Sequence, residues 1–158
     1  MTILALLAAL FAAAFAATAC GGSGDDPGTL SKFAFARQAN ALCSKAKGDR
    51  DAQLQQLPPS PSGTADAQKI HGAATVDREL IRRVDALVPP ESEQTDVDQV
   101  LEAWRKRADL EDQYADAVAA SQDPASLATF SAKQAQIDAT TDPVAVRLGL
   151  TDCTRGTP

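Results

Sequence analysis

Proline-containing breaks divide the chain after residue 30 into four stretches, and each stretch carries apolar residues at helical spacing. The breaks are Pro58-Pro59, Pro89-Pro90 and Asp123-Pro124. Proline ends or distorts a helix because it lacks an amide donor and its ring clashes with the preceding turn. Strand-like alternation does not accompany the helical spacing. Because short connections join long amphipathic helices, the pattern predicts an all-α domain over residues 30–158, arranged as an up-down four-helix bundle.

The apolar spacing also predicts which residues face the core. The first helix is expected from about Ser31 to Leu57, with these core residues: Phe33, Ala36, Asn40, Cys43, Leu54 and Leu57. The second is expected from about Ala65 to Val88, with Thr64 as its cap, and with these core residues: Ile70, Ala73, Ala74, Leu80, Ile81, Val84, Leu87 and Val88. The third repeats the spacing over about 28 residues, through Val97, Val100, Leu101, Trp104, Ala108, Tyr114, Ala115 and Val118.

Asp123-Pro124 predicts the start of the fourth helix, because an aspartate cap followed by proline at the first helical position is a specific start signal. The expected core residues of this helix are Leu127, Phe130, Gln134, Ile137 and Thr141. Asp142-Pro143 then repeats the same signature. Either the fourth helix kinks there or a short fifth helix begins. Gly149 is expected to cap the last helix.

The first twenty residues differ from the rest of the chain. Residues 3–17 form an uncharged run of small and apolar side chains, and all 15 Lys and Arg residues follow it. The run is too short for a comfortable transmembrane helix, which needs about 20 apolar residues. Its length and small-residue ending are typical of a secretory signal peptide.

The end of this run, Ala17-Thr18-Ala19-Cys20, resembles the lipobox of bacterial lipoprotein precursors. Ala17 stands where that family most often has Leu. The resemblance implies that Cys20 carries diacylglycerol through a thioether and becomes the first residue of the mature chain. Residues 1–19 would then be the signal peptide, 20–29 a lipidated Cys with a Gly/Ser/Asp-rich linker, and 30–158 the helical domain. The alternative is an ordinary cleaved signal followed by a Cys with no special role.

An exported, lipid-anchored chain lies on the extracytoplasmic face of the cell membrane, where thiols can oxidise. Two cysteines remain besides Cys20, and we predict that Cys43 and Cys153 form a disulfide. The first and last helices of an even-numbered bundle can lie side by side, which brings these positions together. The alternatives are two separate buried thiols, or a zinc site, for which two thiolates form an incomplete ligand set.

Two segments of the domain resemble small, Ala-rich lipoproteins of high-GC actinobacteria. They are residues 39–43 (ANALC), which follow Phe33, and residues 148–153 (LGLTDC). The resemblance favours the helical fold and the disulfide. It implies no particular activity.

Charged residues and the single histidine indicate no catalytic or metal centre. His71 is expected to face solvent or a neighbouring polar group, and no second histidine supports a metal site or cofactor. The clusters Arg82-Arg83 and Arg105-Lys106-Arg107 lie near acidic residues and are expected on solvated faces, as are Asp109, Asp112 and Asp116. The formal charge of −6 argues against nucleic-acid binding.

The function expected from these features is that of a non-catalytic binding module of the cell envelope, whose partners are the membrane, through Cys20, and an envelope protein. A second hypothesis is a carrier or sensor of a small hydrophobic molecule, held in a groove near Trp104 and Tyr114. The alternative, and the commoner role of such rings, is that they are the large side chains of an Ala-rich core. A third hypothesis, an envelope enzyme, requires converging carboxyl groups with raised pKa values in a cleft.

Overall fold

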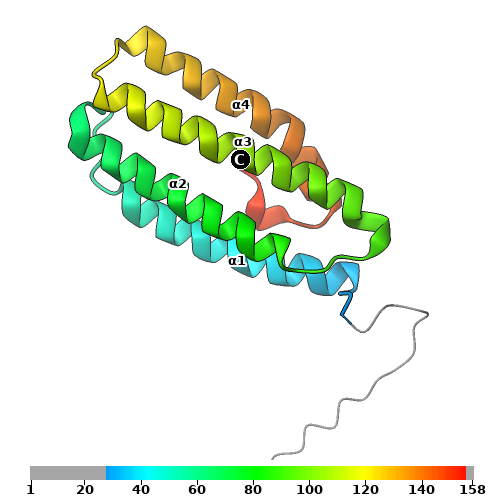
Figure 1. Cartoon of the computed structure of the whole chain (residues 1–158). Coiled ribbons are helices and arrows are strands. Elements are labelled where there is room, and N and C mark those ends of the chain that lie inside the picture. The colour runs from blue at the N-terminus through cyan, green and yellow to red at the C-terminus, as the bar shows by residue number, and fades with distance from the viewer. Residues whose placement is uncertain (1–27, 156–158) are drawn as a thin grey trace, which may run out of the picture.

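The computed structural model describes residues 28–155, which form four α-helices and two short 3₁₀ helices. The α-helices are α1 (Lys32–Leu54), α2 (Gly63–Asp85), α3 (Gln94–Ala119) and α4 (Pro124–Arg147), and the 3₁₀ helices are η1 (Glu91–Glu93) and η2 (Thr151–Cys153). Successive α-helices run in opposite directions (Figure 1). The prediction of an all-α, four-helix arrangement is confirmed. Cys20, the signal peptide and most of the linker lie outside the described residues.

Polar caps begin two of the helices. Ser31 starts α1 by accepting a hydrogen bond from the Ala34 N–H at 3.3 Å. Asp123 starts α4 as predicted, since one of its oxygens accepts from the backbone N–H groups of Ala125 and Ser126. The prediction that Thr64 caps the second helix is wrong. The helix begins at Gly63 with Ser62 at the N-cap position, so Thr64 lies inside it. Asp66 in the first turn accepts a hydrogen bond from the Ser62 N–H at 3.0 Å.

Pro143 lies inside α4, and the described chain has no fifth α-helix. The helix continues to Arg147 because its last turn is held by packing. Val144 and Ala145 are buried, and so is Leu148 just beyond the helix end. Burial of these side chains outweighs the backbone hydrogen bond that the proline cannot donate.

The helices pack in chain order, with α2 and α3 at the centre and α1 and α4 on the outside. Within the described residues α1 and α4 make no extensive contact, so the expected side-by-side placement of the first and last helices is wrong. Figure 1 shows instead that the chain after α4 crosses back to α1. Asn40 of α1 holds this C-terminal segment by donating to the Gly149 carbonyl at 2.8 Å and accepting from the Asp152 N–H at 3.1 Å.

The disulfide joins α1 to this segment. Cys43 and Cys153 are linked, with their Cα atoms 5.1 Å apart and 110 positions apart in the sequence. Cys153 belongs to η2, not to the last α-helix. Closing a loop of about this length can stabilise a fold by about 4–5 kcal/mol through the unfolded chain.

Two apolar clusters form the core. The larger contains Phe35, Ala39, Trp104, Leu148 and the disulfide, among others. The smaller, nearer the α1–α2 connection, is built on Ala67, Ile70, Ala115 and Val118. Two expected core residues are exposed: Phe33 at 76% and Val88 at 51%. Phe33 lies in the first turn of α1, where the buried face runs instead through Phe35 and Ala39, and Val88 follows the end of α2.

Gly149 and Gly48 allow a matched test of the helix ends. Gly149 caps α4 with φ +79°, and a Cβ there would meet Ala36 at 3.2 Å. Gly48 lies within α1 with open space around its Cα. We expect Gly149→Ala to lower the free energy of unfolding by about 1–2 kcal/mol, and Gly48→Ala to raise it by about 0.5–1 kcal/mol. Urea denaturation measures both, and equal effects would contradict the assignment of Gly149 as the cap.

Candidate functional site

Asp77 lies at the centre of a buried cluster of charged groups. Its side chain is 6% exposed, although it belongs to the apolar face of α2. Three guanidinium groups face it from different parts of the fold. Arg50 of α1 lies at 3.5 Å, Arg107 of α3 at 3.6 Å, and Arg155 of the C-terminal segment donates to it at 2.5 Å.

Further carboxyl groups surround the guanidinium groups. Glu111, one turn after Arg107 on α3, accepts a hydrogen bond from Arg50. Asp138 of α4 accepts one from Arg107 at 3.0 Å. The cluster therefore connects all four helices through charge-assisted contacts, which are stronger than neutral hydrogen bonds.

The C-terminal segment completes the charged cluster. Arg155 donates through its side chain to Asp77 and through its backbone N–H to both oxygens of Asp142, at 3.3 and 3.2 Å. Asp142 lies one turn after Asp138 on α4. The C-terminal segment therefore connects α1 to α4, and it places the positively charged side chain of Arg155 in the cluster.

Among the described residues, the cluster contains one more carboxyl group than guanidinium group. The four carboxyl groups belong to Asp77, Glu111, Asp138 and Asp142, and the three guanidinium groups to Arg50, Arg107 and Arg155. Burial raises the pKa of Glu111, and Asp77 adds to this effect. Burial also raises the pKa of Asp138, although Arg107 opposes the shift. Ionising either group therefore costs more in the folded chain than in water.

Three buried polar atoms of this cluster lack a hydrogen-bond partner among residues 28–155. They are Arg50 Nε, Arg107 Nη1 and Glu111 Oε2. The first two still lie within ion-pair distance of Asp77. Incomplete pairing in a buried cluster has a cost in stability.

An open hollow with a volume of ≈ 740 Å³ adjoins the cluster along α4. Its charged base consists of Arg107, Asp138, Asp142 and Arg155. Its walls are formed by Ser131, Gln134, Ala135, Ala139, Pro143 and Val146. The volume is within the range of small-molecule sites. Among residues 28–155, α1 makes no extensive contact with α4, and the C-terminal segment up to Arg155 borders the hollow.

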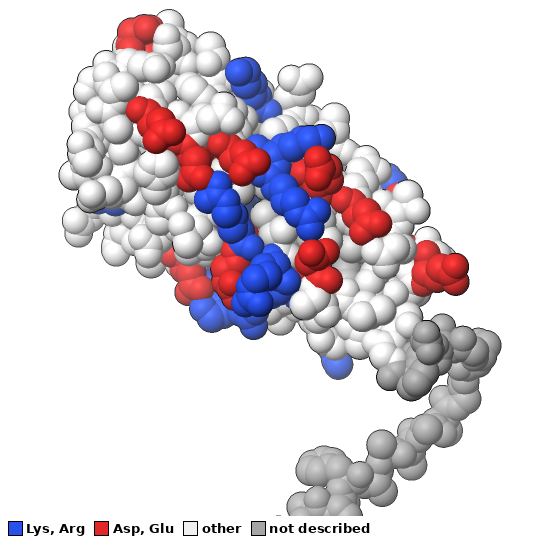
Figure 2. All heavy atoms as spheres, in the orientation of Figure 1, with Lys and Arg blue, Asp and Glu red and all other residues white. Residues whose placement is uncertain are grey.

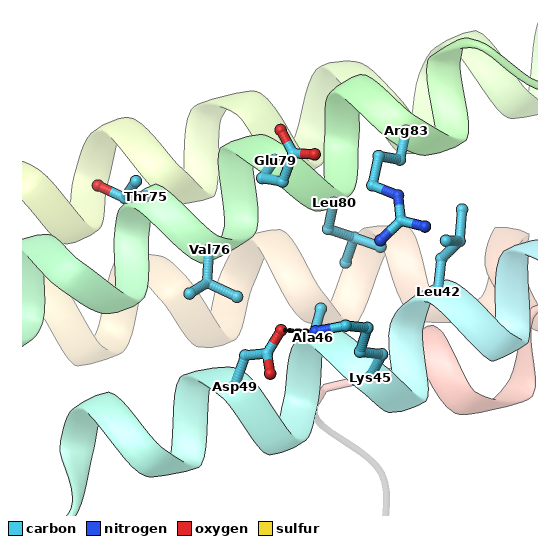
Figure 3. Close-up of a pocket in the computed structure, with 9 residues that line it drawn as sticks. All are labelled: Leu42, Lys45, Ala46, Asp49, Thr75, Val76, Glu79, Leu80 and Arg83. Carbon is cyan, nitrogen blue, oxygen red and sulfur yellow. Dashed lines mark hydrogen bonds and ion pairs between the residues drawn. The ribbon is translucent and has the colours of Figure 1, made fainter.

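Two smaller depressions lie elsewhere. One, of ≈ 260 Å³, is bordered by the disulfide, Trp104 and the other side of Arg107 and Arg155. The second, of ≈ 180 Å³, is a groove between α1 and α2. Figure 3 shows its apolar floor of Leu42, Ala46, Val76 and Leu80, and its rim of charged side chains, where Lys45 pairs with Asp49. Neither depression approaches the volume of the hollow along α4.

Trp104 and Tyr114 do not lie together. Trp104 is 8% exposed and belongs to the larger apolar cluster. Tyr114 packs against the smaller cluster, and its ring stacks at a tilt on Phe130 with centroids 5.8 Å apart. The expectation that both rings line one groove therefore does not match their positions. The ten residues between them correspond to about 15 Å along a helix.

Most of the other charged residues lie on the surface in mixed pairs. Arg105 pairs with Asp85, Lys106 with Glu102, and Arg82 with Glu79. In Figure 2, basic side chains gather in a band across the middle of the visible face, with acidic side chains beside it. The expectation of solvated faces was wrong for Arg107, which is buried. It lies on the side of α3 that faces α4.

His71 contacts acidic neighbours, as one of its two expected environments required. Its Nδ1 lies 2.8 Å from Asp112 and its Nε2 3.3 Å from Asp116. Arg78 also pairs with Asp112, so these groups form a polar link between α2 and α3. Across residues 28–155, no group of three or more His, Cys, Asp or Glu side chains is arranged to hold a metal ion. No helix in that part of the chain is long and apolar enough to cross a membrane.

The chain matches no protein-family model, no curated protein and no solved structure. No relative therefore assigns a role to the hollow or to the charged cluster, and their function is inferred from the geometry of this chain.

Sequence reasoning missed the charged cluster, although its positions carried a signal. Asp77 falls one turn before Ile81 and two turns after Ile70, both predicted to face the core. Arg107 and Glu111 lie three and seven residues after Trp104, on the predicted buried face of α3. A charged residue inside an apolar helical stripe is rarely buried unless it is paired. That rule could have identified these positions, but not their partners.

Asp77→Asn tests whether the cluster supports the fold. The substitution keeps the shape of the side chain but removes the charge that faces three guanidinium groups. We expect it to lower the free energy of unfolding by about 3–5 kcal/mol, because breaking a buried pair leaves uncompensated charge. Asp109→Asn is the matched control: its side chain is 69% exposed and pairs with Arg78 at 3.4 Å. It should cost less than about 1 kcal/mol. Urea denaturation at neutral pH compares them, and similar losses would show that Asp77 has no special role.

Proposed function

We propose that this protein is a non-catalytic binding module of the bacterial cell envelope, held at the extracytoplasmic face of the cell membrane by an acylated Cys20. The observation that carries the binding role is the open hollow along α4, with apolar walls and a base of fixed charges. The lipobox-like sequence before Cys20 and the Gly-rich linker after it support the anchor. Anchoring would confine the domain to a thin layer and raise its effective concentration towards envelope components.

The arrangement of charges favours binding over catalysis. A catalytic carboxyl group must be able to exchange a proton with a substrate in its reach. Asp138 lines the hollow and has a raised pKa, which is the feature that an envelope enzyme would require. Its Oδ1, however, accepts a hydrogen bond from Arg107. A group fixed in this way is suited to orienting a bound molecule.

A second candidate function is a carrier or sensor of a small molecule. The size of the hollow favours it, because ≈ 740 Å³ accommodates a compact ligand rather than a protein segment of any length. Ala135, Ala139 and Val146 supply the apolar contact that such a ligand requires. In this version the site differs from the predicted region around Trp104 and Tyr114.

Metabolic labelling with radioactive palmitate tests the anchor. We expect the wild-type chain to incorporate label and Cys20→Ala to incorporate none, because the thioether forms only on a cysteine thiol. A chain with both Cys43→Ala and Cys153→Ala is the matched control and should still be labelled. Equal labelling of wild type and Cys20→Ala would refute Cys20 as the acylation site.

Photo-crosslinking in cells tests the binding role. A photoreactive amino acid in place of Ala139 would project into the hollow, whereas the same residue in place of Ala119, on exposed α3 surface, would not. We expect mass spectrometry of the purified chain to find a reproducible adduct at position 139 and none at position 119. The same adducts at both positions, or none at 139, would contradict a binding role for the hollow.

A further inference from the structure

We propose that the end of the bundle from which the chain leads back to Cys20 contacts the lipid bilayer, with Phe33 and Val88 at the membrane interface. The inference rests on the proposed function, because it needs the acylated Cys20 as an anchor. It goes beyond that function by naming a second contact with the membrane. It also names the orientation of the domain, whose helices stand upright on the bilayer.

The exposed large apolar side chains gather at one end of the bundle. Among residues 28–155 they are Phe33 at 76%, Val88 at 51% and Val146 at 52% exposed. Phe33 lies in the first turn of α1, Val88 follows the end of α2, and Val146 lies in the last turn of α4. Figure 1 shows that α1 starts where α2 and α4 end. We call this end of the bundle, where α3 also starts, the proximal end.

Ion pairs hold the proximal end together. Lys32 of α1 pairs with Glu93 at 3.1 Å, and Arg147 of α4 pairs with Asp96 at 3.2 Å. The start of α1 and the end of α4 therefore both lie beside the start of α3. Both cations already have acidic partners, and the formal charge of the whole chain is −6. Attraction to anionic lipid is therefore not what draws this end to a membrane, and the contact depends on the apolar side chains.

The chain between the anchor and the domain limits the orientations that an anchored domain can take. Leu30 is fixed to the proximal end, because its N–H donates to the Val88 carbonyl at 2.8 Å. Cys20 lies ten positions before Leu30, and ten residues span at most about 36 Å when fully extended. The 26 residues of α3 correspond to about 39 Å along the bundle. An anchored domain therefore does not reach the bilayer with its opposite end.

The sides of the bundle fit a bilayer less well than the proximal end does. They carry charged pairs such as Arg105 with Asp85 and Lys106 with Glu102, and Figure 2 shows basic and acidic groups across the middle of one side. Removing such groups from water is costly. An upright domain leaves these pairs in water and places the ring of Phe33 at the interface, where burial of apolar surface is favourable.

Fluorescence quenching by brominated lipid tests the contact. The acylated chain, purified with its disulfide intact, is reconstituted into phosphatidylcholine vesicles whose acyl chains carry bromine near the headgroups. Trp104, the one tryptophan of the sequence, is 8% exposed and supplies the background measured on wild type. We expect the emission added by Phe33→Trp or by Val88→Trp to fall at least about twofold relative to vesicles without bromine, because aromatic rings sit at the headgroup level. Ser60→Trp, in the exposed α1–α2 connection at the opposite end, is the matched control and should keep its emission.

A second set of variants tests whether Phe33 holds the domain at the bilayer. In the Val88→Trp chain, Phe33→Ser should restore most of the emission that bromine removes. Phe33→Leu should not restore it, because leucine keeps an apolar surface for the interface. Phe33 is exposed, so both variants should unfold at the same urea concentration as their parent chain. High salt should leave the quenching unchanged, since salt screens charges and not apolar contacts.

Three results would overturn the inference. Equal quenching at positions 33 and 60 would show that the domain has no preferred orientation. Full emission at positions 33 and 88 would show that the proximal end stays clear of the lipid. Emission at position 33 that shifts to the blue with protein concentration, without quenching by bromine, would assign this surface to a second copy of the chain.

The anchor is measured separately, so the two failures are distinguishable. If palmitate labels Cys20 but bromine does not quench position 33, the proposed anchor stands and only the orientation is wrong. If Cys20 is not acylated, the proposed anchor and this inference fall together. Crosslinking at position 139 does not depend on either result.

Discussion

The interaction on which the rest of this structure depends is the contact of Asp77 with three guanidinium groups. A buried carboxylate of this kind is tolerated only if paired, and here its partners come from α1, α3 and the C-terminal segment. Through Arg107 and Arg155 the same contacts reach Asp138 and Asp142 of α4. Four helices that bury mostly small apolar side chains are thereby held in one relative arrangement. Ionic groups are directional in a way that alanine packing is not.

The same arrangement explains why the bundle is not closed by a contact between its outer helices. The chain after α4 turns at Gly149 and crosses to α1, where Asn40 and the disulfide hold it. This segment is narrower than a helix. Within the described residues, it borders the hollow along α4 through Arg155, with Asp138 at the base of the hollow. The candidate site is therefore a direct consequence of how the fold is closed.

A fold that carries its fixed charges at the base of an apolar hollow is suited to holding a molecule with one charged end. Arg107 and Asp138 at its base are held by their mutual hydrogen bond, and preorganised sites lose less affinity to ordering.

The sequence by itself determined the helical class, the number of helices and the start of α4, because proline positions, cap residues and apolar spacing act within a few residues of each other. Gly149 was also identified correctly, since its role depends on the local backbone alone. Only the tertiary structure decided that α1 and α4 stay apart, that Arg107, Glu111 and Asp138 are buried, and that Trp104 and Tyr114 belong to different clusters. The reason is physical. A charged residue on a helix is stable in the interior only when oppositely charged partners on other helices lie within ion-pair distance. No local sequence pattern specifies the distances between residues of different helices.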